Sequence, residues 1–374
     1  MSTTNKANFP LRAPRAWHGM TTGIWLRLLA NHGFSISPTR VPLAVSITAF
    51  SCLNTLARLV EDALYARRAR SVEVAAPLFI IGHWRTGTTL LHELLVRDEQ
   101  FGYPTMYDCM SPHHFLHTHY LAPCLSWLLP KHRPMDNMLI GLDRPQEDEF
   151  ALCNLGVPSP YLTWAFPNES RYDRYLDLLE LPAAERRAWK KTFVWFLQRL
   201  TVKDPRRLVL KSPTHTARVK TLLELFPDAQ FVHIIRDPFV VVPSTLMMWE
   251  RMSDAMGLNT NCREDLEDHL FRLSARMHAR FEVDRRQVSP TQICDVHFEQ
   301  LVEDPVGTIE GIYSQLRLGD FERVRSKLAD YVEQTKGYRR NQHEISTALR
   351  DKIAEHWSEY LERYGYAPAA LRAG

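Results

Sequence analysis

The chain has 374 residues, of which 45% are hydrophobic and 24% charged, and its formal net charge is +3. This composition supplies enough apolar material for one large globular domain or two smaller ones, and it excludes a largely disordered chain. The mildly basic balance falls short of the concentrated positive charge of a nucleic-acid-binding protein. We therefore expect no nucleic acid partner and an anionic small molecule instead.

The six cysteines are scattered without a C-x-x-C pair, so the sequence predicts neither a zinc knuckle nor a compact disulfide framework. Residues 1–17 are polar and contain proline and arginine where a cleavable export signal has an apolar core. Both features favour a reduced, cytoplasmic protein.

Residues 1–70 are predicted to form a helical N-terminal extension. Residues 41–57 contain no charged side chain and are flanked by Arg40 and Arg58. A spanning helix needs about 20 predominantly apolar residues, and the polar residues in this run disfavour it. Two placements of this helix stay open. The helix packs on the domain, or it lies peripherally at the inner face of a membrane with its arginines near anionic headgroups.

Residues 71–374 alternate short apolar runs with longer helical patterns, which favours an α/β fold with a P-loop-like parallel sheet flanked by helices. Strands are predicted over residues 77–81, 207–210, 230–235 and 292–297. Helices are predicted over residues 88–96, 214–225 and 238–251. Because parallel strands end at the same edge of a sheet, we expect the functional site at that edge.

A glycine-bounded loop follows the first predicted strand. Gly82 and Gly87 stand at the G-x-x-x-x-G spacing at which a strand turns into a helix and its backbone N–H groups surround an anion. An ATP-binding loop continues with Lys-Ser or Lys-Thr, whereas this chain continues with Thr88 and Thr89. Its cation lies inside the loop, at Arg85. This substitution points away from ATP and toward sulfuryl transfer.

A second anion site is predicted after the strand over residues 230–235. There Arg236, Asp237 and Pro238 open a helix that carries Ser244 two turns later. A guanidinium fork, the first N–H groups of a helix and a hydroxyl can together bind a phosphate. An Arg-Asp-Pro sequence alone is also typical of a plain helix cap, but two anion sites in one sheet indicate a nucleotide phosphorylated at both ends.

Together these residues resemble the sulfotransferases that depend on 3′-phosphoadenosine 5′-phosphosulfate (PAPS), in particular a bacterial branch related to tyrosylprotein and carbohydrate sulfotransferases. The resemblance covers most of residues 75–340. The family's P-R-[ST]-G-T-T loop is similar to residues 83–89, with Trp84 where a proline is common. Its L-K-S-P-x-H and Y-E-x-L-x-x-D-P segments are similar to residues 210–215 and 297–305.

The resemblance implies PAPS as co-substrate and no required metal. It assigns the 5′-phosphosulfate to the loop, the 3′-phosphate to the arginine and serine eight residues apart, and a basic closing loop to the region near residue 336. A solvated basic turn is an equally good interpretation of that last segment. The implied cofactor-binding residues are Arg85, Thr86, Gly87, Thr88, Thr89, Arg236, Ser244, Lys336, Gly337 and Arg339.

Sulfuryl transfer requires cations near the leaving oxygen and a base at the acceptor hydroxyl. Arg85 and Lys211 can stabilise the leaving group, although Lys211 also fits a salt bridge at a strand end. Two main candidates for the base stay open, with Asp108 as a further one. His215 lies four residues after Lys211 but can simply cap a helix. Glu147 belongs to an acidic group that fits a solvated face equally well, and the resemblance places it near the acceptor, within an insertion over residues 102–164.

The expected acceptor is a hydroxyl of a lipid, glycolipid or carbohydrate, because an aromatic-rich insertion and an interfacial helix suit an amphipathic molecule. Peptide tyrosine and a small phenol stay as alternatives. A P-loop ATP-dependent phosphotransferase, with Asp237 binding magnesium, is opposed by the missing lysine. A non-catalytic nucleotide-binding, membrane-associated protein is opposed by the presence of Lys211, Arg236 and Ser244. The histidines within residues 113–119 lack the sequence context of a metal site. The sequence leaves the oligomeric state open.

Overall fold

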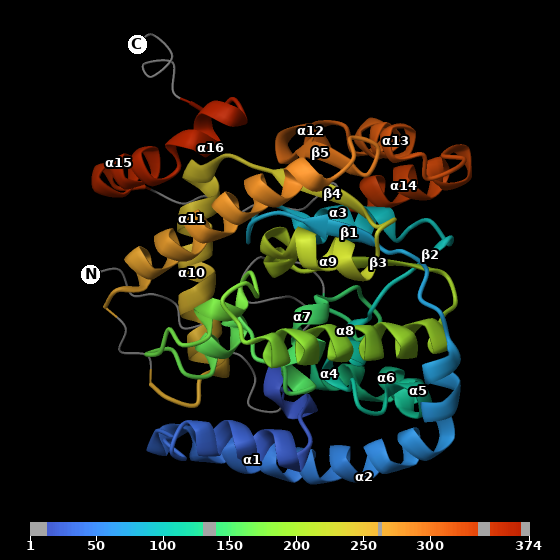
Figure 1. Ribbon diagram of the computed structural model, residues 1–374, viewed down its shortest axis with the longest axis vertical. Coiled ribbons are helices and arrows are strands. Elements are labelled where there is room, and N and C mark those ends of the chain that lie inside the picture. Colours follow the sequence, from blue (N-terminus) through green and yellow to red (C-terminus); the bar gives the residue numbers. More distant parts are fainter. Residues whose placement is uncertain (1–12, 130–139, 261–263, 336–344, 368–374) are drawn as a thin grey trace. The chain divides into compact units, whose positions relative to one another are not determined.

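The computed structural model describes residues 13–129, 140–260, 264–335 and 345–367 (Figure 1). The chain forms two compact units, each built from discontinuous segments. Unit 1 comprises Met1–Ala75, Gln100–Leu210 and Trp249–Glu264, and unit 2 comprises Ala76–Glu99, Lys211–Met248 and Asp265–Gly374. Within the described ranges, five strands form a parallel sheet in the order β2-β3-β1-β4-β5. The predicted α/β fold with a parallel sheet flanked by helices is therefore confirmed.

Unit 2 contains the strands that lead into both predicted anion sites. These are β1 (Leu78–Ile81), β4 (Gln230–Ile235) and β5 (Ile293–His297), which pair in parallel and match the predicted strands to within one residue. Every residue of β1 is buried, which explains its continuous apolar sequence. Because the strands are parallel, the loops that begin at Gly82 and Arg236 leave from the same edge of the sheet.

The predicted helix over residues 214–225 is wrong in its first half. The chain forms a 3-10 helix, η7 (Pro213–Arg218), and becomes α-helical only in α9 (Val219–Leu225). The Thr216 hydroxyl binds both the N–H (2.8 Å) and the carbonyl (3.0 Å) of Gly82. This tertiary contact falls within the tight 3-10 turn, and local propensity does not encode it.

Of the remaining helices of unit 2, α3 and α10 match the predicted helices over residues 88–96 and 238–251, and the others were not predicted; α10 continues from unit 2 into unit 1. They are α3 (Thr88–Leu95), α10 (Pro238–Met256), α11 (Leu266–Asp284), α12 (Phe298–Glu303), α13 (Pro305–Leu316), α14 (Glu322–Thr335), α15 (Thr347–His356) and α16 (Ser358–Arg363).

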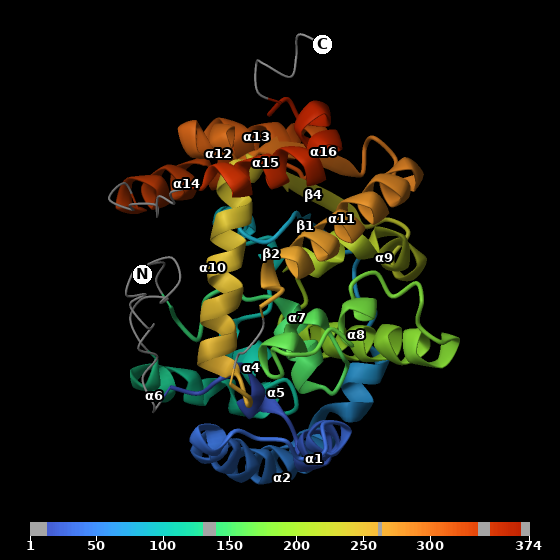
Figure 2. The ribbon, with the colours of Figure 1, turned by 90° about the vertical axis from the view of Figure 1, so that its left-hand side faces the viewer.

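Unit 1 is mainly helical, and the predicted helical N-terminal region is confirmed. Its long helix α2 contacts α1, α5 and α8, and Figures 1 and 2 show α1 running alongside α2. The predicted insertion folds as short helices, and β2 was not predicted because it has only two residues. The elements are α1 (Thr22–Asn31), α2 (Val41–Ser71), β2 (Phe101–Gly102), α4 (Met106–Met110), α5 (Phe115–Thr118), α6 (Ala122–Leu125), α7 (Asp148–Asn154), α8 (Ala183–Lys203) and β3 (Arg207–Lys211).

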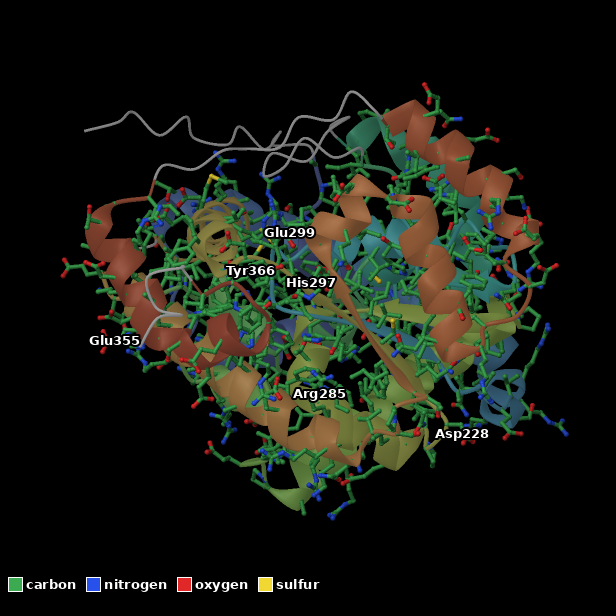
Figure 3. All side chains as sticks on the ribbon, turned by 90° about the horizontal axis from the view of Figure 1, so that it is seen from above. Asp228, Arg285, His297, Glu299, Glu355 and Tyr366 are labelled. Carbon is green, nitrogen blue, oxygen red and sulfur yellow. The ribbon has the colours of Figure 1, made fainter. Side chains whose placement is uncertain are left out.

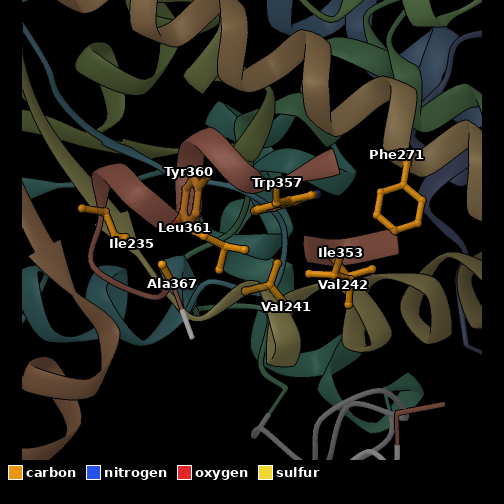
Figure 4. Close-up of a cluster of buried hydrophobic side chains, with 9 residues drawn as sticks. All are labelled: Ile235, Val241, Val242, Phe271, Ile353, Trp357, Tyr360, Leu361 and Ala367. Atoms are coloured by element: carbon orange, nitrogen blue, oxygen red, sulfur yellow. The ribbon is translucent and has the colours of Figure 1, made fainter. Parts of the chain in front are cut away.

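A buried cluster in unit 2 fixes the end of β4. The C-terminal helices α15 and α16 contribute aromatic and aliphatic side chains that pack on β4, α10 and α11 (Figure 4). From this cluster, the Tyr360 hydroxyl accepts a hydrogen bond from the Arg236 N–H (3.2 Å). The C-terminal helices therefore hold the strand end that carries Arg236. The cluster consists of Ile235, Val241, Val242, Phe271, Ile353, Trp357, Tyr360, Leu361 and Ala367.

Polar contacts connect the C-terminal segment to the end of β5 (Figure 3). The Tyr366 hydroxyl donates to Glu299 (2.6 Å) and lies 3.2 Å from Nδ1 of His297. On the same strand, Asp295 accepts from Arg285 (2.8 Å). These contacts stabilise the start of α12, which borders the phosphate-binding loop.

Candidate active site

The two loop glycines are required by close approach of neighbouring elements. At Gly82, an added Cβ would lie 2.7 Å from the carbonyl oxygen of Ile234 in β4. Gly87 adopts φ = +103°, and its Cβ would collide with the ring of Phe298 at the start of α12. Only glycine combines such a conformation with the missing side chain. Both glycines are therefore required for the loop to pack against β4 and α12.

Arg85 connects the two predicted anion sites. Its backbone has φ = +68°, a strained conformation for a residue with a side chain and one that is concentrated at functional sites. Its Nε donates to the hydroxyl of Ser244 on α10 (2.9 Å). Its carbonyl oxygen accepts from Nη1 of Arg236 (2.9 Å). The structure therefore brings together Arg85, Arg236 and Ser244, which lie far apart in the sequence.

Phe298, an aromatic residue for which we predicted no role, holds Arg236. The guanidinium carbon of Arg236 lies 4.0 Å from the ring centre of Phe298, a cation–π contact. The same ring faces Gly87. Phe298 thus connects the phosphate-binding loop with the second arginine. The only sequence signal was an aromatic residue directly after β5, in a segment already similar to the sulfotransferases.

The three threonines of the loop contribute in different ways. The Thr86 hydroxyl donates to the His83 carbonyl (2.7 Å), so it holds the loop together. Thr88 and Thr89 begin α3, where the first backbone N–H groups have no partner within the helix. These N–H groups and the positive end of the helix dipole favour an anion. The loop therefore offers backbone donors at Thr88 and Thr89.

His83 and Trp84 form the floor of the loop. His83 is buried, and burial lowers its pKa to about 4, so the ring is neutral. Its Nδ1–H donates to the Trp84 carbonyl (2.9 Å), and its Nε2 accepts from the Ser274 hydroxyl (2.7 Å). Trp84, which stands where the family has proline, is also buried. These two residues shape the loop from within unit 2.

Lys211 and the candidate base His215 are both buried in unit 2. Lys211 ends β3 and is almost fully buried, a position that strengthens its charge interactions. His215 lies in η7, is fully buried, and packs its ring edge-on against Phe79 of β1 at 5.5 Å between ring centres. A ring enclosed in this way is suited to positioning the segment that follows Lys211.

Glu147 occupies a different setting, in unit 1. It is half-buried at the N-cap of α7, and its Oε2 accepts from the Tyr161 hydroxyl (2.5 Å). The Tyr161 ring stacks on Trp164 at 4.3 Å between ring centres. Asp148 and Glu149, by contrast, are fully buried. The acidic group is therefore no solvated face, and Glu147 is its most accessible carboxylate.

The other predicted sites differ in outcome. Lys336, Gly337 and Arg339 lie outside the described residues. In the part of the chain that the structure describes, no group of three or more His, Cys, Asp or Glu side chains is placed to hold a metal. Two histidines of the 113–119 segment contact α2 instead: His114 reaches Asn54 (3.1 Å) and His117 reaches Glu61 (3.1 Å).

Known proteins share both the sequence and the fold. Residues 77–323 match the sulfotransferase family. The omega-hydroxy-beta-dihydromenaquinone-9 sulfotransferase Stf3 of Mycobacterium bovis is 40% identical over 363 residues, which cover 95% of this chain and 94% of that enzyme. Its counterpart in Mycobacterium tuberculosis gives the same values.

Two solved structures support the fold. Sulfotransferase STF1 of M. tuberculosis has 19% identity and a TM-score of 0.64, with 90% of each chain covered. Sulfotransferase STF9 of Mycobacterium avium has 18% identity and a TM-score of 0.67, with 92% of this chain and 96% of that chain covered. With the arginine-bearing loop and the family match over most of its length, the chain belongs to the sulfotransferase family of enzymes.

Proposed function

We propose that this sulfotransferase uses PAPS as donor and a hydroxylated menaquinone-type lipid as acceptor. The observation that carries the acceptor is the 40% identity to an enzyme named for omega-hydroxy-beta-dihydromenaquinone-9, over 95% of this chain. This similarity extends across both units and is not restricted to the phosphate-binding loop. Of the three acceptor classes expected from the sequence, it favours the lipid.

The residues of unit 2 fit a nucleotide with two anionic ends. Arg85 and Arg236 are permanent cations, Ser244 adds a hydroxyl, and α3 adds backbone N–H donors. We assign Arg85 and the start of α3 to the 5′-phosphosulfate, and Arg236 with Ser244 to the 3′-phosphate.

The cations of unit 2 account for the acceleration of the reaction. When bound, PAPS supplies a sulfuryl group attached to a phosphate leaving group. Negative charge develops on the leaving oxygen, and fixed cations stabilise it best where water is excluded. Arg85, held by its contact with Ser244, and the buried Lys211 provide such charges. Neither cation requires a metal ion to act.

For the acceptor base we propose Glu147 in preference to His215. A base must reach the hydroxyl from which it takes a proton. His215 is fully buried against Phe79, whereas Glu147 is half-buried and is oriented by the Tyr161 hydroxyl. In this assignment the acceptor O–H proton passes to the Glu147 carboxylate, the acceptor oxygen bonds to sulfur, and the bond from sulfur to the 5′-phosphate oxygen breaks. The leaving group is 3′-phosphoadenosine 5′-phosphate. His215 then has the role of positioning the segment around Lys211.

A direct comparison of donors and acceptors tests the proposal. The purified enzyme is incubated with PAPS and a short-chain, detergent-soluble ω-hydroxymenaquinone, and products are followed by mass spectrometry with EDTA present. We expect a sulfated quinone, and no product from the same quinone without the terminal hydroxyl. Product formed only with ATP and magnesium would overturn the donor. Sulfation of carbohydrate but of no quinone would overturn the acceptor.

A further inference from the structure

Helix α2 in unit 1 exposes most of its large apolar residues, Ile47 excepted, and buries several polar ones. Its buried side includes Ser51, Asn54 and Glu61. Leu53, Leu56 and Leu64 are each 62% exposed, although a helix that packs on a soluble domain normally turns such residues inward. The exposed large hydrophobic residues of α2 are Val41, Val45, Phe50, Leu53, Leu56, Leu59, Val60 and Leu64. We call this set the α2 apolar face.

Hydrogen bonds fix α2 on unit 1 through its polar side. Asn54 donates to the carbonyls of His18 (2.6 Å) and Met20 (2.9 Å) near its middle. Two helical turns later, Glu61 accepts a hydrogen bond from the N–H of Leu116 (2.9 Å). Arg199 of α8 donates to Asp62 at 2.8 Å. These contacts fix the polar side of α2 on unit 1. The exposed apolar side chains of α2 therefore face away from unit 1 and can contact another surface.

Unit 1 exposes further large apolar side chains outside α2. On the α1 side, Leu26 and Phe34 are exposed. In the segment with α5 and α6, Tyr120 and Trp127 are each 65% exposed. Tyr and Trp are the side chains enriched where a membrane meets water. Surface patches of this kind on a soluble chain mark interaction sites.

The part of the sequence that contains this face is rich in basic residues. Residues 1–71 contain nine Lys or Arg and two Asp or Glu, whereas the whole chain has 46 and 43. Arg67, Arg68 and Arg70 end α2 and are exposed. Clustered arginines beside apolar side chains match a surface that is apolar and bears negative headgroups.

We propose that the α2 apolar face binds the surface of an anionic lipid bilayer, with α2 lying parallel to the membrane plane. The polar side of α2 stays on unit 1, the leucines enter the headgroup boundary, and the arginines contact anionic headgroups. The docking itself is independent of the acceptor. Only its consequence rests on the proposed function: docking would bring the enzyme to the membrane in which the quinone acceptor is dissolved.

Two other occupants fit the observations less well. A second copy of the chain would bring the same basic segments together across a twofold axis, and like charges repel. Residues 38–71 are long and apolar enough, by length and composition, to cross a membrane. Spanning, however, would strip Asn54 and Glu61 of the partners that satisfy them in unit 1 and place them in hydrocarbon.

Flotation of the full chain with vesicles tests the proposal. One set of vesicles is pure phosphatidylcholine, and the other has equal parts phosphatidylcholine and phosphatidylglycerol. The apolar variant is Leu53→Ser/Leu56→Ser/Leu64→Ser, which replaces exposed residues and should leave the fold intact. The charge variant is Arg67→Gln/Arg68→Gln. Matched controls in unit 2 are Val283→Ser, an exposed apolar residue, and Arg272→Gln/Arg286→Gln.

We expect the wild type to float with the anionic vesicles, and less so at high salt. The apolar variant should bind at least about tenfold more weakly, and the charge variant should lose the preference for phosphatidylglycerol. Both controls should bind like the wild type. The proposal would be overturned if the wild type floated with neither kind of vesicle, or if the apolar variant floated as well as the wild type.

Further readouts separate the alternatives. Retention in cell membranes after alkaline carbonate extraction would show spanning, and a dimer that only the apolar variant dissociates, without vesicle binding, would show self-association. Either result contradicts docking. Activity on the detergent-soluble ω-hydroxymenaquinone should be unchanged in the apolar variant. If that activity is absent even in the wild type while vesicle binding persists, the proposed acceptor fails and the docking stands.

Discussion

Unit 2 buries its apolar runs and places arginines at strand ends, whereas α2 in unit 1 buries polar side chains and exposes leucines. Among the described residues of unit 2, Val283 is the one large hydrophobic side chain that is exposed. The buried cluster of Figure 4 illustrates the first arrangement and Leu53, Leu56 and Leu64 the second. We assign the first arrangement to an anionic nucleotide and the second to an apolar solvent.

The difference shows that apolar content alone does not decide where a segment lies. The run that forms β1 and the run that opens α2 are both uncharged in the sequence. Every residue of β1 is buried. α2 meets unit 1 through hydrogen bonds, so its apolar residues remain outside. The predictions below test whether these two arrangements have the separate roles that we assign to them.

The largest expected effect concerns the acceptor base. Glu147→Gln should lower kcat by about 10²–10⁴-fold, because the amide cannot take the acceptor proton. Affinity for 3′-phosphoadenosine 5′-phosphate should be unchanged, as measured by calorimetry. His215→Asn is the matched comparison and should mainly reduce thermal stability. A severe loss of kcat in His215→Asn with a silent Glu147→Gln, both folded, would transfer the role to His215.

The next effect concerns the cation of the loop. Arg85→Ala removes positive charge from the leaving-group end and should lower kcat by about 10²–10³-fold. The fold should survive, because alanine keeps the Cβ that the backbone at φ = +68° already accommodates, and only the side chain beyond Cβ is lost. Steady-state kinetics at saturating PAPS measure the effect, and the exposed Arg272→Ala is the control. Near wild-type turnover would remove Arg85 from the reaction.

A smaller effect is expected at Phe298. Phe298→Leu removes the ring beneath Arg236, and such contacts are worth roughly 0.5–2 kcal/mol, or about 3- to 30-fold in affinity. The loss should appear for 3′-phosphoadenosine 5′-phosphate and not for adenosine 5′-phosphosulfate, which lacks the 3′-phosphate. Phe321→Leu, which removes a ring beneath Arg325, is the control. Equal weakening of both nucleotides would show that Phe298 only supports the loop.

The last prediction concerns the attachment of α2. Burial raises the pKa of Glu61 to about 8, against the opposing charge of Arg199 and hydrogen bonds from His117 and Leu116. Because this pKa lies above that of the unfolded chain, the folded state holds the proton more tightly. Stability should therefore fall as pH rises from about 4.5 to 8, by at most about 1.4 kcal/mol per pH unit in that window. Denaturant unfolding of wild type and Glu61→Gln at several pH values measures it. An identical slope in both proteins would contradict this role of Glu61.

Much of the fold followed from local patterns. The strands of unit 2 are short apolar runs bounded by turn residues, and the loop between Gly82 and Gly87 has a spacing that physical chemistry explains. Arg85, Arg236 and Ser244 were predicted as anion ligands, and the structure shows them in direct contact. Local sequence was sufficient here because each residue directly follows a strand or lies on the helix that does.

The rest depends on contacts between distant segments. Phe298 reaches Arg236 and Gly87 from another strand, and Tyr360 reaches Arg236 from the C-terminal helices. The hydrophobic periodicity of a sequence does not predict such long-range pairs. The exposure of the leucines of α2 likewise depends on which groups of unit 1 bind Asn54, and an apolar run does not reveal its partner face.

The most direct test of the central claim places both arrangements in one reaction. Wild-type enzyme is incubated with isotopically labelled PAPS and anionic vesicles that contain a long-chain ω-hydroxymenaquinone, without magnesium, and lipid extracts are analysed by mass spectrometry. We predict the label as a single sulfate ester on the terminal hydroxyl, absent with Arg85→Ala and reduced with Leu53→Ser/Leu56→Ser/Leu64→Ser. A folded wild-type enzyme that leaves the quinone unlabelled would contradict the account.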